Sequence, residues 1–389
     1  MKSKVNKQIL WLSLGFFFIF LGYNAVQQYV TSYFSETDIS KIGFQSLIIV
    51  YLFYLLSGPL SAVYVSKYGA KKCMILGSLT YSLFIFILPF LNITLLWIAS
   101  IILGIGASLL WTGQNSYLVR ASDEKEYGAN SGLFSTILTL GSTAGLLLLS
   151  FLIARFSFKI SFFWYSLFPL AALFFLGRLE DIKTKEVKNQ LTLIKKSIKS
   201  SSALRLTVFF FSFSFIFGLV IGIIPIDIKN TLSLNYVGPL TSVFWIMPIL
   251  FSYISGKGSD ITGRKRMIFV SYVLGALGLL TLYFAQSQSV LLLTLGVVLL
   301  SITYAIFRPI GFAFIGDVAN EDNLVSLTAF FGMAQNVGVL AALLISSLIL
   351  PVASYIIATT VLLLSVAILF PILKVDLKEV RLRLAKEIQ

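Results

Sequence analysis

The stretch Gly256-Lys257-Gly258-Ser259-Asp260-Ile261-Thr262-Gly263-Arg264-Lys265 separates two long apolar segments of the chain. It holds charged residues and three glycines, whereas the flanking segments, residues 236–256 and 266–286, are mostly apolar. Each flanking segment has the length, about 20 residues, that a helix needs to cross the hydrocarbon core of a bilayer. The pattern therefore predicts two transmembrane helices joined by a short basic loop.

The rest of the chain repeats this alternation. Of its 389 residues, 58% are hydrophobic and 12% are charged, while soluble domains carry about 25% charged residues. No water-soluble core buries so much apolar surface, so the bilayer must act as part of the solvent. We predict an all-α membrane protein with twelve transmembrane helices, over residues 9–34, 42–65, 72–91, 94–119, 128–154, 159–178, 205–227, 236–256, 266–286, 289–316, 324–349 and 351–373.

Basic residues are concentrated in every second gap between these segments. One set of gaps includes the N-terminus, the loops at 67–72 and 257–266, the 178–205 connector and the C-terminal tail. The other set holds only Lys41, Arg155, Lys159 and Lys229. Cytoplasmic loops of membrane proteins are enriched in Lys and Arg. The sequence thus predicts a multi-pass protein of the cell membrane with both termini in the cytoplasm.

The charge and the composition also exclude several functions. The net charge of +14 is divided among these gaps and forms no continuous basic face, so we expect contact with lipid headgroups and no nucleic-acid partner. The chain has no His and a single Cys, Cys73, which excludes a Cys/His metal site and a Ser-His or Cys-His catalytic pair. No Walker-type phosphate loop is present. We therefore expect neither an enzyme nor a bound cofactor or metal.

Sliding the chain against itself by about 195 residues aligns similar features. The loop at 67–72 falls near residues 261–266, and the acidic loop at 123–126 falls near residues 320–322. The repeat predicts two similar six-helix halves, residues 1–178 and 205–389, the second with a cytoplasmic tail. A cytoplasmic linker at 179–204 joins them. The linker has six lysines between Leu and Ile residues, which fits either an amphipathic helix on the membrane surface or a solvated connector.

The two halves and the loop quoted above resemble the major facilitator superfamily over nearly the whole chain. The loop signature of that family is G-x-x-x-D-R-x-G-R-R, and this chain has Ile261 where a basic residue is usual. The first-half copy is degraded, with Ala62 at the Gly position and Ser66 at the Asp position. The resemblance implies a fold of two pseudo-symmetric six-helix bundles, with a gating role for Asp260, Gly263, Arg264 and Lys265.

Two further motifs refine the resemblance. The helix-5 pattern of antiporters in the family ends in Gly-Pro, but here Gly141-Ser142-Thr143-Ala144-Gly145 is followed by Leu146, which argues against a standard proton-driven drug exporter. The motifs Trp111-Thr112-Gly113-Gln114-Asn115-Ser116-Tyr117 and Asn130-Ser131-Gly132-Leu133-Phe134 are similar to the branch of "uncoordinated" channel-regulator proteins. Some members of that branch are described as regulators, so the resemblance leaves both a carrier and a regulator open.

Arg308 is the one clearly intramembrane basic residue of the sequence, beside Pro309 in the tenth predicted helix. A charge at the centre of a membrane helix costs roughly 2.5–3.5 kcal/mol on insertion scales, so such residues face a partner or a wet cavity. Its planar guanidinium suits a carboxylate, sulfonate or phosphate on a solute. The sequence leaves equally open a structural salt bridge near the inner gate.

Polar residues of other helices are candidates for the same cavity. Asn24, Gln27 and Gln28 lie on one stripe of the first predicted helix, and because polar groups facing lipid are costly, the stripe is expected to face the bundle interior. There it lines a solute site near the midplane or supplies hydrogen bonds between helices. The remaining candidates are Trp111, Gln114 and Asn115, with packing as the alternative for Trp111, and Gln335 and Asn336.

The hypothesis favoured by these residues is a secondary transporter that moves a small polar organic solute, anionic or zwitterionic, by alternating access. The alternative is a transport-inactive regulator or partner of another membrane protein, which a cavity filled with aromatic side chains would favour. Asp227 fits either a proton carrier or an interfacial residue paired with Lys229, and the coupling ion stays open. We expect a monomer.

The loop signature also predicts a contact that differs between the halves. Asp260 ends the eighth predicted helix near the start of the fifth, where a carboxylate gains about 0.3–1 kcal/mol from the helix N-terminus. Arg264 and Arg266 are expected to pair with the acidic loop, at Glu124 and Glu126. Because the counterpart of Asp260, Ser66, has no charge, we expect an asymmetric latch, and the resemblance assigns such a latch to the outward-open state.

Overall fold

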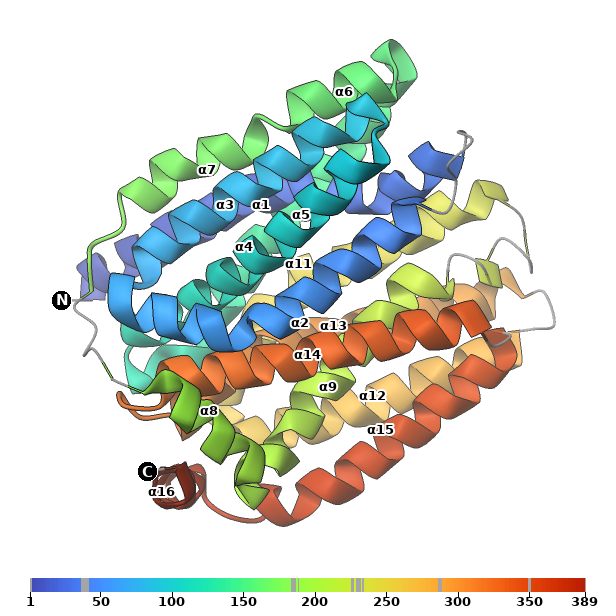
Figure 1. Cartoon of the computed structure of the whole chain (residues 1–389). Coiled ribbons are helices and arrows are strands. Elements are labelled where there is room, and N and C mark those ends of the chain that lie inside the picture. The colour runs from blue at the N-terminus through green and yellow to red at the C-terminus, as the bar shows by residue number, and fades with distance from the viewer. Residues whose placement is uncertain are drawn as a thin grey trace. The chain divides into compact units, whose positions relative to one another are not determined.

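The computed structural model describes residues 2–35, 42–182, 187, 189–224, 227–228, 232, 234–285, 289–348 and 351–388. Within these ranges the chain forms helices, turns and short connections, and no strand. Twelve segments are long and apolar enough to cross a membrane, which confirms the predicted all-α fold with twelve spans. Figure 1 shows the helices coloured along the chain.

The helices follow one another with short connections. The first seven are α1 (Lys2–Ser35), α2 (Ile42–Tyr68), α3 (Ala70–Ile87), α4 (Ile93–Arg120), α5 (Tyr127–Phe156), α6 (Phe158–Tyr165) and α7 (Phe168–Gly177), with 3-10 turns η1 (Leu88–Phe90) and η2 (Glu124–Glu126). They are followed by α8 (Gln190–Lys199), α9 (Ser201–Gly222), α11 (Leu234–Thr262), α12 (Arg264–Phe284), α13 (Val290–Val318), α14 (Leu324–Leu348), α15 (Pro351–Leu373) and α16 (Leu377–Ile388).

The sixth predicted span is divided into two helices in the structure. Helix α6 ends at Tyr165, and α7 begins at Phe168. Pro169 has no N–H to donate to the carbonyl of Tyr165, so the ladder of hydrogen bonds is interrupted there. The N–H of Leu167 instead bonds the carbonyl of Trp164 at 3.2 Å in a tight turn. The two short helices together still provide one span of 20 residues.

By their internal contacts, the helices form two compact units. Unit 1 comprises Met1–Ser122, Ile137–Ile194 and Glu321–Met333, and unit 2 comprises Asp123–Thr136, Lys195–Asn320 and Ala334–Gln389. The units differ from the predicted halves in two helices, because the first turns of α5 belong to unit 2 and the first turns of α14 belong to unit 1. The division at 1–178, 179–204 and 205–389 stays a prediction.

The internal repeat is visible in the backbone of two equivalent turns. Gly69 joins α2 to α3, and Gly263 joins α11 to α12. Their φ angles are 88° and 92°, a region that residues with a Cβ atom rarely adopt. An added Cβ would meet no atom within 4 Å at either position. The backbone conformation of the turn, and not a lack of space, therefore requires glycine at both places.

Large apolar side chains lie on the outside of the helices as well as in the core. Phe16, Tyr81 and Phe134 are fully buried, whereas Leu56, Phe151 and Trp164 belong to a large group of exposed apolar residues. In water such a surface would favour aggregation, but in a bilayer it faces hydrocarbon of the same polarity. The exposed side chains are therefore the lipid-facing surface of the spans.

The linker between the predicted halves contains a helix, α8, whose position on a membrane surface stays a prediction. Ile194 and Ser197 on one side of α8 are buried, and Leu191 and Ile198 are exposed. Residues 183–186 and 188, which include three of the six linker lysines, lie outside the described part of the chain. Exposed Leu and Ile beside lysines are typical of helices that lie on a membrane surface.

Candidate functional site

The predicted solute-facing residues occur in both compact units. Unit 1 contains Asn24, Gln27, Trp111, Gln114 and Asn115, and unit 2 contains Arg308, Gln335 and Asn336. The side chain of Gln28 lies outside the described part of the chain. That the two sets line one cavity stays a prediction, so each set is considered within its own unit.

The polar stripe of α1 points into unit 1. Asn24 and Gln27 are both buried, and Nε2 of Gln27 donates a hydrogen bond to the hydroxyl oxygen of Tyr51 in α2 at 2.7 Å. Next to Asn24, the ring of Tyr23 packs edge-to-face on Tyr81 of α3, with centroids 4.8 Å apart. The stripe thus meets a tyrosine hydroxyl of α2 at Gln27, while the adjacent Tyr23 packs on a tyrosine of α3.

In α4, Trp111 and Gln114 lie one turn apart and have different surroundings. The ring of Trp111 contacts Phe16 and Phe20 of α1, with centroids 5.4 and 5.3 Å away, as expected for a packing aromatic. Gln114 is fully buried, and neither Nε2 nor Oε1 has a hydrogen-bond partner among the described residues. The same holds for Oδ1 of the adjacent Asn115. Since buried polar groups are nearly always hydrogen-bonded, these amides are the groups of unit 1 best suited to bind a solute or water.

Arg308 lies on a cluster of aromatic rings inside unit 2. It is 7% exposed, and the centre of its guanidinium lies 5.6 Å from the ring centroid of Tyr304. Tyr304 in turn stacks with Phe213 and Phe217 of α9, at centroid distances of 5.0 and 5.8 Å. A cation over an aromatic face gains about 0.5–2 kcal/mol. The rings therefore help to hold a buried charge whose planar donors suit a bidentate anion.

The two candidates in α14 differ in exposure. Asn336 is buried, and Gln335 is partly exposed.

Trp245 of α11 also belongs to the aromatic cluster around Arg308, with its ring centroid 6.2 Å from that of Tyr304. This cluster was not predicted from the sequence, although Phe213 and Phe217 are spaced four residues apart and thus share one face of α9.

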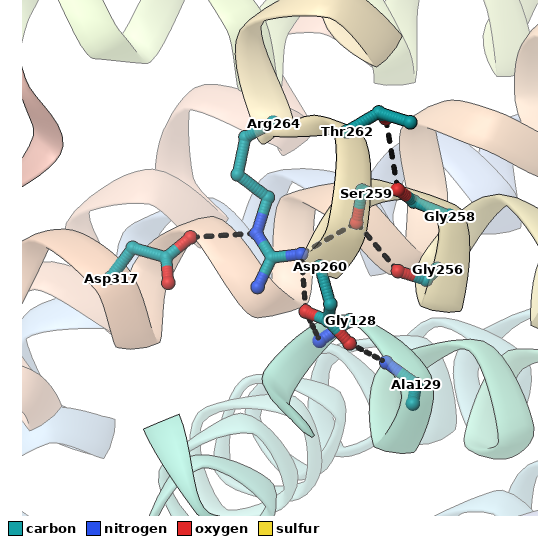
Figure 2. Close-up of polar contacts among 9 residues, drawn as sticks. All are labelled: Gly128, Ala129, Gly256, Gly258, Ser259, Asp260, Thr262, Arg264 and Asp317. Carbon is teal, nitrogen blue, oxygen red and sulfur yellow. Dashed lines mark hydrogen bonds and ion pairs between the residues drawn. The ribbon is translucent and has the colours of Figure 1, made fainter. Parts of the chain in front are cut away.

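A charged network connects the end of α11 to the start of α5 (Figure 2). Oδ1 of Asp260 accepts a hydrogen bond from the N–H of Gly128 at 2.9 Å, and Oδ2 accepts one from the N–H of Ala129 at 2.7 Å. The Asp260 side chain is only 10% exposed. Bonds from backbone N–H groups to a carboxylate are among the strong ones, and the positive end of the helix dipole adds to them.

Arg264 extends this network to α13. Its Nη1 lies 2.6 Å from Oδ1 of Asp260, and its Nε lies 2.8 Å from Oδ2 of Asp317. Ser259 accepts a further bond from Nη1 at 2.5 Å. Lys265, the next residue, is partly exposed and makes no ion pair with a described residue. Arg264 is therefore the cation that joins three helices, as Figure 2 shows.

The predicted pairing of Arg264 with the acidic loop is wrong. Arg264 follows the turn at Gly263 directly and is buried between Asp260 and Asp317, while Arg266 is exposed. Glu124 instead pairs with Arg381 of α16, at 2.9 Å. Asp317 was not among the predicted partners, because the tenth span was expected to end at residue 316. A single carboxylate just beyond a long apolar run is the signal that could have found it.

The backbones of α5 and α11 touch beside this network. A Cβ atom added at Gly128 would lie 2.2 Å from the carbonyl oxygen of Gly256, and one added at Gly256 would lie 2.2 Å from that of Gly128. One turn further, a Cβ at Gly132 would lie 2.6 Å from the carbonyl oxygen of Ser252. Each obstacle is backbone, which cannot rotate away as a side chain can. The glycines therefore allow Asp260 to reach the start of α5.

We expect Gly256→Ala to separate the first turns of α5 from α11. Overpacking costs about 1–3 kcal/mol, which favours the separated state by roughly five-fold or more. The reporter is a cysteine introduced at Ser252, in a Cys73→Ala background. Ser252 is fully buried, and its hydroxyl has no partner among the described residues, so the reporter removes no hydrogen bond. The measurement is the rate at which maleimide labels this cysteine.

Gly258→Ala is the matched control for this prediction. Gly258 lies in the same helix, and an added Cβ there would meet no atom within 4 Å. It should leave the labelling rate unchanged. If both alanine variants label at the same rate, the close contact of the two helices does not control access to position 252.

The first-half counterpart of Asp260 has a different partner. Oγ of Ser66 accepts hydrogen bonds from Nε2 of Gln190 and from the N–H of Val187, both at 3.3 Å. Both partners belong to the linker. Ser66 thus contacts the linker through neutral hydrogen bonds, while Asp260 binds a helix N-terminus with a full charge.

Asp227 is held by a tyrosine near the end of α9. It is buried, and the hydroxyl of Tyr355 in α15 donates a hydrogen bond to its Oδ2 at 2.6 Å. The partner expected from the sequence, Lys229, lies outside the described residues. The contact with Tyr355 gives this carboxylate a stabilising donor that the sequence did not indicate.

Comparison with known proteins gives a family match and several relatives. The family described as Major Facilitator Superfamily matches residues 12–227 and, a second time, residues 206–387. The UNC93-like protein MFSD11 of Xenopus tropicalis is 32% identical over 149 residues, which cover 37% of this chain and 33% of that protein. The UNC93-like protein 3 of Arabidopsis thaliana is 32% identical over 128 residues, 31% of this chain and 25% of that protein. The chain therefore matches a third or less of the length of these relatives.

A bacterial relative and two solved structures match over longer ranges. Multidrug resistance protein 2 of Bacillus subtilis is 23% identical over 296 residues, 71% of this chain and 74% of that protein. The proton:xylose symporter XylE, bound to 6-bromo-6-deoxy-D-glucose, has a TM-score of 0.77 and 13% identity, over 96% of each chain. The human organic anion transporter MFSD10 has a TM-score of 0.71 and 14% identity, over 94% of this chain and 99% of that one. At these identities the two structures show a shared fold.

Proposed function

The chain belongs to the major facilitator superfamily, and from this premise we propose that it is a secondary transporter of a small organic solute. In this proposal the protein works as a monomer surrounded by lipid, and its solute is anionic or zwitterionic. The observation that carries the proposal is Arg308, a buried cation on an aromatic cluster within a membrane-spanning helix.

The chemistry around Arg308 supports an organic anion. A buried guanidinium pays a large desolvation cost, and a carboxylate, sulfonate or phosphate on the solute offsets it through paired hydrogen bonds. The neighbouring rings of Tyr304, Phe213 and Phe217 suit an apolar or aromatic part of the same solute. The description of MFSD10 as an organic anion transporter agrees with this choice, although its likeness to this chain is one of fold.

The amides of unit 1 supply neutral hydrogen-bonding groups in the proposed site. Gln27 is already bonded to Tyr51, whereas the amide of Gln114 is free to donate and to accept among the described residues. Side chains of this kind bind hydroxyl, amide or ammonium groups of a polar solute. We therefore assign binding roles to Asn24, Gln27, Gln28, Gln114, Asn115, Arg308, Gln335 and Asn336, with Trp111 as packing support.

Alternating access is the proposed mechanism, with the charged network as its cytoplasmic latch. Secondary carriers of this architecture expose a midplane site to each side in turn as one repeat rocks against the other. Such a cycle needs contacts that are strong in one state and broken in the other. The bonds from Asp260 to Gly128 and Ala129, and the ion pairs of Arg264, are the contacts that break in the proposed cycle. Asp260, Gly263, Arg264 and Lys265 are the proposed gating residues.

A transport-inactive regulator is the second candidate. Two of the relatives are UNC93-like proteins, and the rings around Tyr304 fill part of the surroundings of Arg308. A regulator needs the fold and a partner surface but no solute exchange. Uptake of a library of carboxylates, sulfonates and phosphate esters into proteoliposomes distinguishes the two functions. A carrier accumulates or exchanges at least one solute class, while a regulator exchanges none and is stabilised by none.

We further propose that both termini face the cytoplasm of the cell membrane, as the basic loops indicate. Cysteines introduced singly at Lys159 and Val290, in a Cys73→Ala background, should react with an impermeant maleimide on intact cells. One at Thr192 of α8 should react only after permeabilisation. All three native side chains are exposed, so access depends on the side of the membrane. Labelling at 192 on intact cells would reverse the proposed orientation.

A further inference from the structure

We propose that Arg381 of the C-terminal helix α16 is a positioning residue of the cytoplasmic gate, which holds the turn before α5 to the end of α13. This inference rests on the proposed transport cycle. It places part of the gate in the C-terminal tail, outside the loop signature that the family resemblance emphasises.

The guanidinium of Arg381 makes hydrogen bonds with two separate elements. Its Nε donates to the carbonyl oxygen of Ala319 at 2.7 Å, and its Nη2 donates to that of Gly316 at 2.9 Å. Its Nη1 donates to Oε1 of Glu124 in η2 at 2.9 Å. The last carbonyls of a helix lack partners within the helix, and a cation at that end is favourable. Arg381 thus caps α13 and binds the segment before α5 with one side chain.

The end of α13 is the point where Arg381 meets the Asp260 network. Asp317 lies between the two carbonyls that Arg381 binds, and its own carboxylate pairs with Arg264. The ring of Tyr127, at the start of α5, covers Gly316 so closely that an added Cβ there would lie 2.7 Å from it. The start of α5 is therefore held on one side by Asp260 and on the other by Arg381, through Glu124. Movement of α5 away from α11 must break both sets of contacts.

Helix α16 is docked independently of Arg381. Val380, Leu384 and Ile388 form a buried stripe at helical spacing. Near the end of α16, Oε1 of Glu387 accepts a hydrogen bond from the Ser202 hydroxyl at 2.7 Å, and Oε2 accepts bonds from the Ser202 N–H and the Ser200 hydroxyl. These donors lie at the N-terminus of α9, where a carboxylate is favourable.

The charge of Glu387 supports this second anchor. Partial burial raises the pKa of Glu387, but the hydrogen bonds from Ser200 and Ser202 outweigh it and hold the pKa below its ordinary value. The carboxylate is therefore ionised at neutral pH. Because the stripe and Glu387 keep α16 in place, replacing Arg381 should release the gate contact without detaching the helix.

The test uses the cysteine reporter at position 252 in the Cys73→Ala background, in inside-out vesicles. Arg381→Gln should raise its labelling rate about five-fold, the size expected for a partly exposed charge at a helix end. The melting temperature of the purified protein should not change. Arg383→Gln is the matched control, because Arg383 lies on the same helix and its ion pair is with Glu379 of that helix and not with the segment before α5. It should leave the labelling rate unchanged.

A double-mutant cycle separates the gate contact from a general loosening of α16. Glu124→Gln should raise labelling about two-fold alone and should add nothing to Arg381→Gln, because the two residues share one contact. Additive effects would place Arg381 outside the gate, and so would equal effects of Arg381→Gln and Arg383→Gln. A lowered melting temperature with Arg381→Gln would show that its role is structural.

The outcome with Asp260→Asn distinguishes failure of this inference from failure of the proposed function. If Asp260→Asn raises labelling and Arg381→Gln does not, the C-terminal helix takes no part in the gate and the transport proposal stands. If neither variant changes the labelling rate, the first turns of α5 do not separate from α11 in a cycle, and both proposals fall.

Discussion

Replacing Asp260 with Asn is expected to increase labelling of the cysteine introduced at Ser252 on the order of a hundred-fold. Breaking a buried ion pair by removing one partner costs about 3–5 kcal/mol, and every 1.4 kcal/mol changes an equilibrium about ten-fold. The lower end of this range applies here, because Arg264 keeps its second partner, Asp317. The amide of Asn presents one oxygen and one NH2 group to Gly128 and Ala129, so one N–H that Asp260 satisfies loses its acceptor.

Ser66→Ala is the control for Asp260→Asn, since it changes the equivalent position of the first repeat. Ser66 makes neutral bonds at 3.3 Å with Val187 and Gln190, whose net contribution is about 1 kcal/mol or less. Its substitution should leave labelling at position 252 unchanged. Similar effects of Asp260→Asn and Ser66→Ala would contradict an asymmetric latch. No effect of Asp260→Asn would mean that the loop signature here serves topology alone.

The fold was largely predictable because membrane helices are specified locally. Twelve apolar segments follow from hydropathy, and the equivalent turns at Gly69 and Gly263 follow from a short repeated motif. The break in the sixth span was harder to predict, because prolines also lie inside α2, α13 and α15 without ending those helices. Whether a proline breaks a helix depends on how its neighbours satisfy the freed carbonyl, which the sequence does not state.

The latch was predictable in part, because only some of its contacts lie between residues whose positions follow from a local motif. The contact of Asp260 with the start of α5 follows from a charged residue at one helix end and a basic loop signature. The contacts of Arg264 with Asp317 and of Arg381 with Glu124 do not follow from it, because the partners lie far apart along the chain. Arg381 meets Glu124 across 257 positions, and Asp317 lies 53 positions from Arg264. Helix periodicity contains no information about such pairs, which arise only when packed helices bring their ends together.

The solute site shows the same limit. The sequence identified Arg308 from its cost in a membrane, and it identified the stripe of α1 from spacing. It placed Trp111 and Gln114 in one candidate cavity, with packing as the alternative for Trp111. In the structure Trp111 packs against Phe16 and Phe20, whereas the Gln114 amide is buried without a described partner. Two residues one turn apart differ in this way because they meet different neighbours. The sequence does not show which neighbours each of them meets.

Replacing Arg308 with Lys should weaken binding of anionic solutes about 10- to 100-fold while the protein stays folded. Lys keeps the charge but has a point-like ammonium, so it loses the paired hydrogen bonds of a planar guanidinium to a carboxylate. Hydrogen bonds to charged groups contribute about 1.5–3 kcal/mol each, and losing one accounts for an effect of this size. Lys also stacks less well than Arg on the ring of Tyr304.

The measurement compares equilibrium binding and uptake of a transported anion with those of its neutral amide or ester analogue. The substitution should change the affinity for the anion and leave that for the analogue nearly unaltered, because only the anion uses the guanidinium fork. Arg266→Lys is the control, since Arg266 is exposed at the start of α12. Equal affinities of Arg308→Lys and the parent for every anion would rule out bidentate recognition. A uniform loss for charged and neutral solutes, with a lower melting temperature, would instead assign Arg308 to the structure of unit 2, where its contact with Tyr304 would be its main role.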